Sequence, residues 1–104
     1  MSAMIDYSQL AVSIYTQREG GIVVIRPHLE NPTPLTLRYQ MKVSQSSAGG
    51  TSEISQAGEL QSGASGSVVR FSLPEGAVCN VKLQVFDHQA LVKSVDGRCE
   101  GRTQ

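Results

Sequence analysis

The chain has 104 residues, of which 39% are hydrophobic and 17% are charged, and this composition is that of a folded soluble domain with one modest core. Lys plus Arg and Asp plus Glu number nine each, so the chain lacks the basic excess typical of nucleic-acid-binding proteins. Its longest apolar runs are far too short to cross a bilayer, and we therefore expect neither a nucleic-acid partner nor membrane insertion.

The two ends of the chain carry no strand pattern. Residues 1–10 read MSAMIDYSQL and show neither the basic start nor the apolar stretch of a secretory signal. Either the protein stays in the cytosol, or the sequence is the mature form of an exported protein behind a start methionine. We expect flexible segments at residues 1–9 and 100–104, on either side of one domain that spans residues 10–99.

Apolar and polar residues alternate with a period of two through most of the chain, and no window keeps the spacing of an amphipathic helix. The clearest strand has a core face that consists of Leu35, Leu37, Tyr39, Met41 and Val43. In chain order, the predicted strands are Leu10–Thr16, Ile22–Leu29, Leu35–Val43, Ser52–Gln61, Ser67–Leu73, Asn80–Phe86 and Leu91–Val95. Segments rich in Gly, Pro, Asn, Asp and Ser separate them. About seven antiparallel strands predict an all-β fold, an immunoglobulin-like β-sandwich, with a small barrel as the alternative.

The second predicted strand contains the segment most prone to aggregation, residues 21–25, and Arg26 and Pro27 follow it directly. A charge and a missing hydrogen-bond donor at this point would stop further strand pairing, which places Pro27 at a sheet edge or a bulge. The simpler alternative is a strand that bends at the proline.

Residues 44–58 read SQSSAGGTSEISQAG, in which Glu53 is the only ionisable side chain. The segment has glycines but neither the lysine nor the following helix of a phosphate-binding loop. We expect it to form the two arms and the tip of a hairpin, with the turn near residues 48–50.

Cys79 and Cys99 are the only cysteines. If the last two strands form a hairpin centred near Gln89, the two cysteines are equidistant from that centre and fall opposite each other, which permits a disulfide. Such a bond would contribute roughly 3 kcal/mol to stability and would imply an oxidising compartment. The alternative is a pair of buried reduced thiols. Neither cysteine lies near a helix N-terminus or a basic cluster that would lower its thiol pKa, which disfavours a redox-active role.

The sequence contains no motif of a hydrolase and no closely spaced acidic pair at a strand end. Two cysteines cannot supply a four-cysteine zinc site, and His28 and His88 have no spacing that would complete one. We expect no enzymatic activity, no cofactor and no metal site.

Three basic side chains are candidates for protein binding. Arg38 and Lys42 point outward from the third predicted strand, and Lys82 points outward from the sixth, which is its neighbour in an immunoglobulin-like sheet. Glu53 and Glu59 lie on the fourth strand, which we expect in the other sheet, where they would not neutralise the basic face. Such a face suits transient contact with an acidic or polar chain, and the alternative is an ordinary solvated surface.

Three short segments carry a family resemblance: residues 37–46 (LRYQMKVSQS), 50–52 (GTS) and 55–58 (SQAG). In these residues the chain resembles the curli assembly inhibitors of the CsgC/CsgH type, and most of all their alphaproteobacterial CsgH branch. Residues 35–60 carry most of the similarity, and the strand layout to about residue 95 agrees with it.

The resemblance implies a monomeric immunoglobulin-like sandwich in the periplasm, with its signal peptide removed, that keeps the amyloid subunits of curli soluble until export. It implies no catalysis and no cofactor. The enterobacterial branch carries a Cys-x-Cys pair, whereas Cys79 and Cys99 are twenty positions apart, so a redox role proposed from that pair does not apply here.

Two other functional classes compete with this one. An accessory or adhesin-type module would form stable complexes with a folded partner or a glycan, and a small thiol-disulfide enzyme would have an easily reduced Cys79–Cys99 bond. An inhibitor would act through a sheet edge or through charges on a sheet face. Because Arg26 and Pro27 disfavour an open edge at the second strand, we favour the face with Arg38, Lys42 and Lys82.

Overall fold

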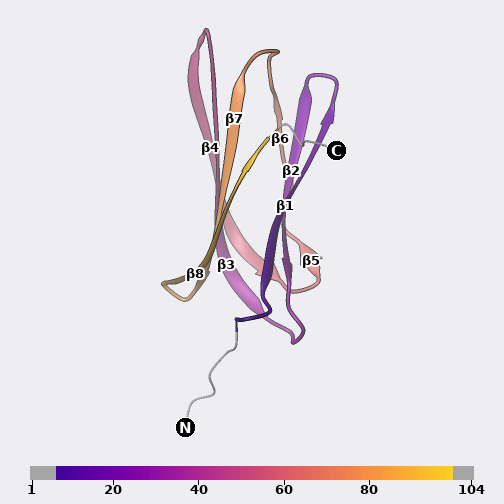
Figure 1. Ribbon diagram of the computed structural model, residues 1–104, viewed down its shortest axis with the longest axis vertical. Coiled ribbons are helices and arrows are strands. Elements are labelled where there is room, and N and C mark those ends of the chain that lie inside the picture. The colour runs from indigo at the N-terminus through magenta and orange to yellow at the C-terminus, as the bar shows by residue number, and fades with distance from the viewer. Residues whose placement is uncertain (1–6, 100–104) are drawn as a thin grey trace.

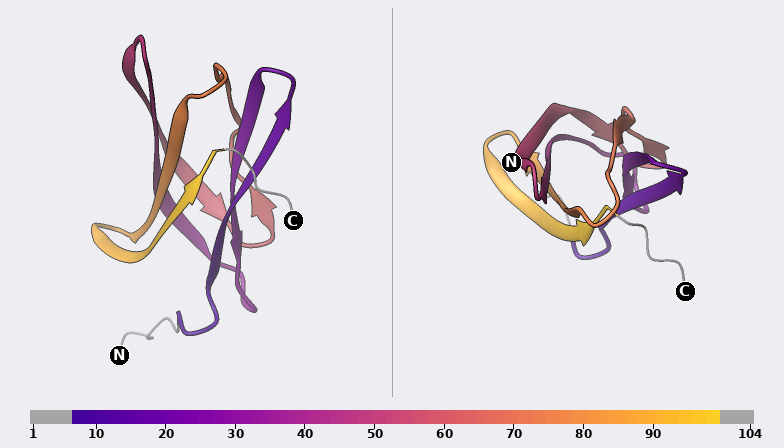
Figure 2. Two further views of the ribbon diagram at one scale, coloured as in Figure 1. Left: turned by 45° about the horizontal axis from the view of Figure 1, so that its top comes forward. Right: turned by 90° about the horizontal axis from the view of Figure 1, so that it is seen from above.

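A computed structural model describes residues 7–99 apart from the side chain of Ser65, and it shows two antiparallel sheets packed face to face (Figures 1 and 2). Of the predicted flexible ends, residues 1–6 and 100–104 lie outside the described residues. Residues 7–99 contain strands and turns but no helix, and so no helix that would cross a membrane.

One sheet has β2 at its centre, with β1 on one side and both β5 and β6 on the other. Its strands are β1 (Ala11–Glu19), β2 (Ile22–Glu30), the two-residue β5 (Ala64–Ser65) and β6 (Val69–Ser72). The other sheet has the order β4-β3-β7-β8, with β3 (Thr36–Ser47), β4 (Gly50–Gln61), β7 (Val78–Asp87) and β8 (Ala90–Arg98). The predicted all-β sandwich of antiparallel strands is confirmed.

The predicted hairpin at residues 44–58 is also confirmed, but its arms are longer than the alternation pattern indicated. β3 continues to Ser47 and β4 begins at Gly50, so the turn consists of Ala48 and Gly49 alone. Hydrophobic alternation ends at Val43 because the arms extend beyond the core, whereas ladder hydrogen bonds need only the backbone and continue into the polar segment.

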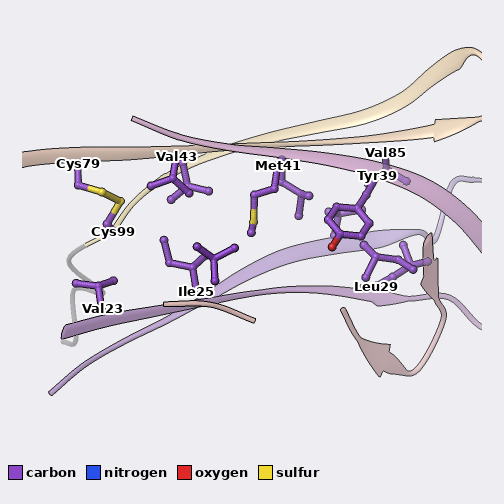
Figure 3. Packing of buried hydrophobic residues seen from close by; sticks show 14 of the residues in the cluster. Val23, Ile25, Leu29, Tyr39, Met41, Val43, Cys79, Val85 and Cys99 are labelled. Carbon is purple, nitrogen blue, oxygen red and sulfur yellow. A yellow bond between two sulfur atoms is a disulfide. The ribbon is translucent and has the colours of Figure 1, made fainter. Parts of the chain in front are cut away.

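The inward side chains of three strands make up most of the core (Figure 3). β2 contributes Val23, Ile25 and Leu29; β3 contributes Leu37, Tyr39, Met41 and Val43; and β7 contributes Cys79, Val81, Leu83 and Val85. Of the five residues predicted for the core face of the third strand, four are buried and Leu35 is partly buried.

Pro27 lies in the central strand β2, and the prediction of an edge or bulge position is wrong. β1 pairs with it through Ile14, and on the other side β6 pairs with residues 22–25 and β5 with residues 28–29. The carbonyl of Pro27 accepts a hydrogen bond from the Gly66 amide at 2.9 Å, so it faces the side of β5 and β6. Since the N–H and C=O of one strand residue point to the same side, the missing N–H falls in the break between β5 and β6 and costs no ladder bond.

The close approach at this break needs a residue without a side chain. A Cβ atom on Gly66 would lie 2.8 Å from Leu60 Cδ2 and 3.0 Å from Cγ of the rigid Pro27 ring.

We therefore expect Gly66→Ala to lower the free energy of unfolding by about 1–2 kcal/mol through overpacking, as measured by urea denaturation. Gly21→Ala is the matched control, because a Cβ there meets nothing within 4 Å. Equal stability of the two variants would contradict the importance of this contact.

Tyr7, which precedes β1 in the chain, links the start of the first sheet to the β4-β3-β7-β8 sheet. The Tyr7 hydroxyl donates a hydrogen bond to Asp87 Oδ2 at the end of β7. This bond, burial and the negative charge of Asp87 together raise the pKa of Tyr7 to about 12, so the phenol stays neutral and keeps its donor well into the alkaline range.

The predicted disulfide is present. Cys79 and Cys99 are both buried and bonded, with their Cα atoms 5.3 Å apart, and the Cys99 amide donates to the Cys79 carbonyl at 3.1 Å. The β7–β8 turn consists of His88 and Gln89, and a bulge between Val85 and Phe86 keeps the rest of the hairpin symmetric about residue 89, as the sequence predicted.

Replacing both cysteines with alanine should lower the free energy of unfolding by roughly 3 kcal/mol, because the unfolded chain regains the freedom of the closed loop. Chemical denaturation with and without a thiol reductant measures this directly. If the reduced and oxidised wild-type proteins were equally stable, the bond would contribute nothing to the fold.

Candidate functional site

The candidate site is the outer face of the β4-β3-β7-β8 sheet. Arg38 and Lys42 project from β3, Lys82 projects from β7, and all three side chains are exposed. β3 and β7 are neighbours, as predicted, and the register places Lys42 directly opposite Lys82. Arg38 lies opposite Phe86, four residues along the strand from Lys42.

The two glutamates of β4 share this face, and their predicted placement in the other sheet is wrong. β4 pairs with β3, which sets Glu59 opposite Arg38 and Glu53 opposite Ser44. The Ser44 hydroxyl donates to Glu53 Oε2 at 3.3 Å. The two-residue turn explains the difference, since it is too short for the chain to cross to the other sheet after β3. The face is therefore mixed in charge, and not basic throughout.

A shallow groove of about 490 Å³ runs along this face, and both Lys42 and Lys82 line it together with Asp96 of β8. It adjoins a hollow of about 500 Å³ toward the hairpin tip, and the two share Ser44 and Asn80 in their walls. This second hollow is lined mainly by hydroxyl and amide side chains. The groove thus offers two ammonium groups beside the Asp96 carboxylate at one end, and mainly hydroxyl and amide groups together with the Glu53 carboxylate at the other.

Arg38 does not belong to this groove. It lines a separate hollow of about 550 Å³ with His88 and Gln89 at the β7–β8 turn, and Glu59 lies beside it on β4. The structure therefore brings Lys42 and Lys82 together and leaves Arg38 apart from them, next to an opposite charge.

The two lysines keep their charges available to a partner. Within residues 7–99, neither Lys42 nor Lys82 makes a hydrogen bond or ion pair with another side chain, although Asp96 lies opposite Lys82 on β8. Like charges that face each other across two strands destabilise a sheet. The sequence could have indicated that Lys42 faces Lys82, because their pairing follows from the register once β3 and β7 are known to be neighbours.

The opposite face carries an aromatic feature that the sequence analysis missed. Tyr15 is 49% exposed, and its ring stacks on His28 with centroids 5.2 Å apart. His28 Nε2 lies 2.6 Å from Glu30 Oε2. The sequence feature that could have revealed this pair is the Gly20–Gly21 turn, because it fixes the β1–β2 register and so brings Tyr15 near His28. Among the described residues, no group of three or more His, Cys, Asp or Glu side chains is placed to hold a metal ion.

Replacing Lys42 with glutamine should remove the repulsion from Lys82 and raise the free energy of unfolding by about 0.2–0.5 kcal/mol. Salt screens such charges, so the gain should shrink as ionic strength rises. Urea denaturation at two salt concentrations measures both effects. Arg38→Gln is the control, because it removes a charge that faces Glu59 and should give no gain. A loss of stability in Lys42→Gln would contradict the repulsion.

No protein-family model matches the sequence, and a search of curated proteins found no match. The fold does match solved structures, and two of them are the following. The solution structure of CsgH from R. palustris has a TM-score of 0.69 and 18% sequence identity, over 88% of this chain and 93% of that one. The E. coli curli protein CsgC has a TM-score of 0.64 and 14% identity, over 88% of this chain and 98% of that one. The resemblance seen in the sequence is thus found again in three dimensions, and the chain has the fold of the CsgC/CsgH type of curli protein.

Proposed function

We propose that this protein is a non-catalytic holding factor that binds curli amyloid subunits transiently and prevents their premature polymerisation. The observation that carries the proposal is the similarity of its fold to CsgH and CsgC over almost the whole of both of those chains. We also propose that it belongs with them as one family, that it acts as a monomer, and that it uses no cofactor.

The groove with Lys42 and Lys82 supports a transient mode of binding. Exposed charges draw a partner in by long-range attraction and give little lasting affinity, because water and salt compete for them. The polar end of the groove adds hydroxyl and amide groups that can form hydrogen bonds with a partner. A factor that must release its subunits for export needs such a surface.

The Cys79–Cys99 disulfide supports a location outside the reducing cytosol. Disulfides persist in oxidising compartments, of which the bacterial periplasm is one. We propose the periplasm, where amyloid subunits would be held before they leave the cell.

Added well below equimolar amounts to a purified curli subunit, the protein should delay fibre growth in a dye-fluorescence assay. Reversing both groove charges, by Lys42→Glu with Lys82→Glu, should bring the lag time back toward that of the subunit alone, because the attraction becomes repulsion. Arg38→Glu should have a smaller effect, since Glu59 already lies beside it.

The matched control reverses two exposed charges on the other sheet, by Arg26→Glu with Arg70→Glu. It changes the net charge by the same amount and leaves the groove intact. If the variant with Lys42→Glu and Lys82→Glu delayed fibre growth as long as the wild-type protein does, the groove would be excluded as the contact surface. No delay by the wild-type protein at any ratio would exclude the holding function itself.

An accessory or adhesin-type module remains the second candidate, and the exposed Tyr15 favours it. An aromatic ring that is half exposed and stacked on His28 is of the kind that anchors a folded partner or a glycan. This class would form stable stoichiometric complexes, which size-exclusion chromatography detects and which a transient holding factor would not form.

A further inference from the structure

β4 is an edge strand over its whole length. It pairs with β3 alone, in a ladder of twelve residue pairs without a register shift. In Figure 1 the β3–β4 hairpin rises to its own tip, apart from the tips of the other hairpins. The other side of β4 therefore has no partner strand among the described residues.

The register shows which main-chain groups this edge presents. The Ser62 amide donates to the Leu35 carbonyl at 2.8 Å, and these two residues continue the β3–β4 register. Because hydrogen-bonded and non-bonded pairs alternate in an antiparallel ladder, the even-numbered residues of β4 bond to β3. The odd-numbered residues Thr51, Glu53 and Ser55 then direct their N–H and C=O groups away from β3, in the plane of the sheet and toward its open edge.

The chain that follows β4 packs against the lower half of this strand, residues 56–61, through the inward side chains of Gln56 and Leu60. The Gln56 side-chain amide donates to the Ser67 carbonyl at 2.9 Å, and Gly66 packs closely against Leu60. The upper half, residues 50–55, projects past this segment. The upper half is therefore the part of the edge that lies beyond these contacts.

The remaining edges of the sandwich are less open. β1 and β8 lie side by side, and Lys93 Nζ donates to the Leu10 carbonyl at 3.3 Å between them. A bulge also interrupts the pairing of β7 with β8. β6 has only four residues, and Pro74 follows it closely.

The upper half of β4 also lacks the usual protection of an edge. Natural edge strands carry lysine, proline or a bulge that blocks further pairing. Residues 50–55 contain none of these, and Glu53 is their only charge. The neighbouring side chains of Thr51 and Ser55 are small, so a further strand can approach.

We propose that residues 51–55 of β4 pair with an extended polar segment of the amyloid-forming partner, with a basic side chain of that segment opposite Glu53. This inference rests on the proposed function and identifies its docking edge. An amyloid-forming chain offers extended backbone for such pairing, and covering one of its edges removes the template on which the next subunit would add. The hollow lined by Thr51 and Glu53 joins this edge to the lysine groove, so one partner chain can contact both.

The experiment is amide hydrogen exchange of the wild-type protein, read residue by residue by NMR, with and without excess curli subunit during the lag period. In the free protein the outward amides of Thr51, Glu53 and Ser55 should exchange rapidly. Pairing should slow them about threefold or more, while the outward amides of β8 stay unchanged.

Ser55→Pro removes one outward N–H without touching the bonds to β3, and it should shorten the delay in fibre growth. Ser94→Pro is the matched control on β8. The bond from Cys99 to Cys79 shows that odd-numbered β8 residues face β7, so the amide of Ser94 also points outward. This control should delay fibres as the wild-type protein does.

The outcomes separate the edge from the function. A normal delay without slowed exchange in β4 overturns the edge and leaves the holding function standing. Slowed exchange without any delay supports the edge and overturns the holding function. Slowed exchange that depends on protein concentration and needs no subunit assigns the edge to a second copy of this chain, which also overturns the proposal.

Discussion

The two-residue turn at Ala48 and Gly49 is the constraint on which the candidate surfaces depend. A connection this short holds β4 beside β3. Because β7 pairs with the other side of β3, β4 is the outermost strand of its sheet. Glu53 and Glu59 then share a face with the basic residues, which limits the positive charge to the groove around Lys42 and Lys82. The same placement leaves one side of β4 unpaired.

Local pattern was enough to predict the strands and the facing cysteines. Alternation identified the buried side chains of β3 and the outward direction of Lys82 on β7, and symmetry about Gln89 placed Cys79 opposite Cys99. The sequence pattern could not predict which strands pair when they lie far apart in the chain. Pro27 is tolerated in a central strand only because β5 and β6, which come some forty residues later, leave a break opposite its nitrogen. No feature of the second strand alone reveals that break.

The candidate site was likewise predicted in its local features and not in its grouping across strands. The outward direction of Arg38, Lys42 and Lys82 follows from alternation within each strand, and the structure confirms that these side chains are exposed. Their separation into a lysine groove and an isolated arginine depends on which strand lies on each side of β3. In the proposed function the groove and the β4 edge have different roles, since charges act at a distance and without direction, whereas main-chain hydrogen bonds act only at contact and in one register.

Three hairpins of the sandwich, β1–β2, β3–β4 and β7–β8, are each closed by a two-residue turn. They are local in sequence and need little loop closure, whereas the pairing of Ile22 with Ser72 joins residues fifty positions apart. Folding of this chain is therefore expected to form the hairpins before β6 reaches β2. Until then, the apolar residues 22–25 are covered on one side only, by β1. A protein proposed to hold amyloid-forming chains is thus expected to pass through a stage in which its own central strand is open to pairing, and the arrival of β6 ends that stage.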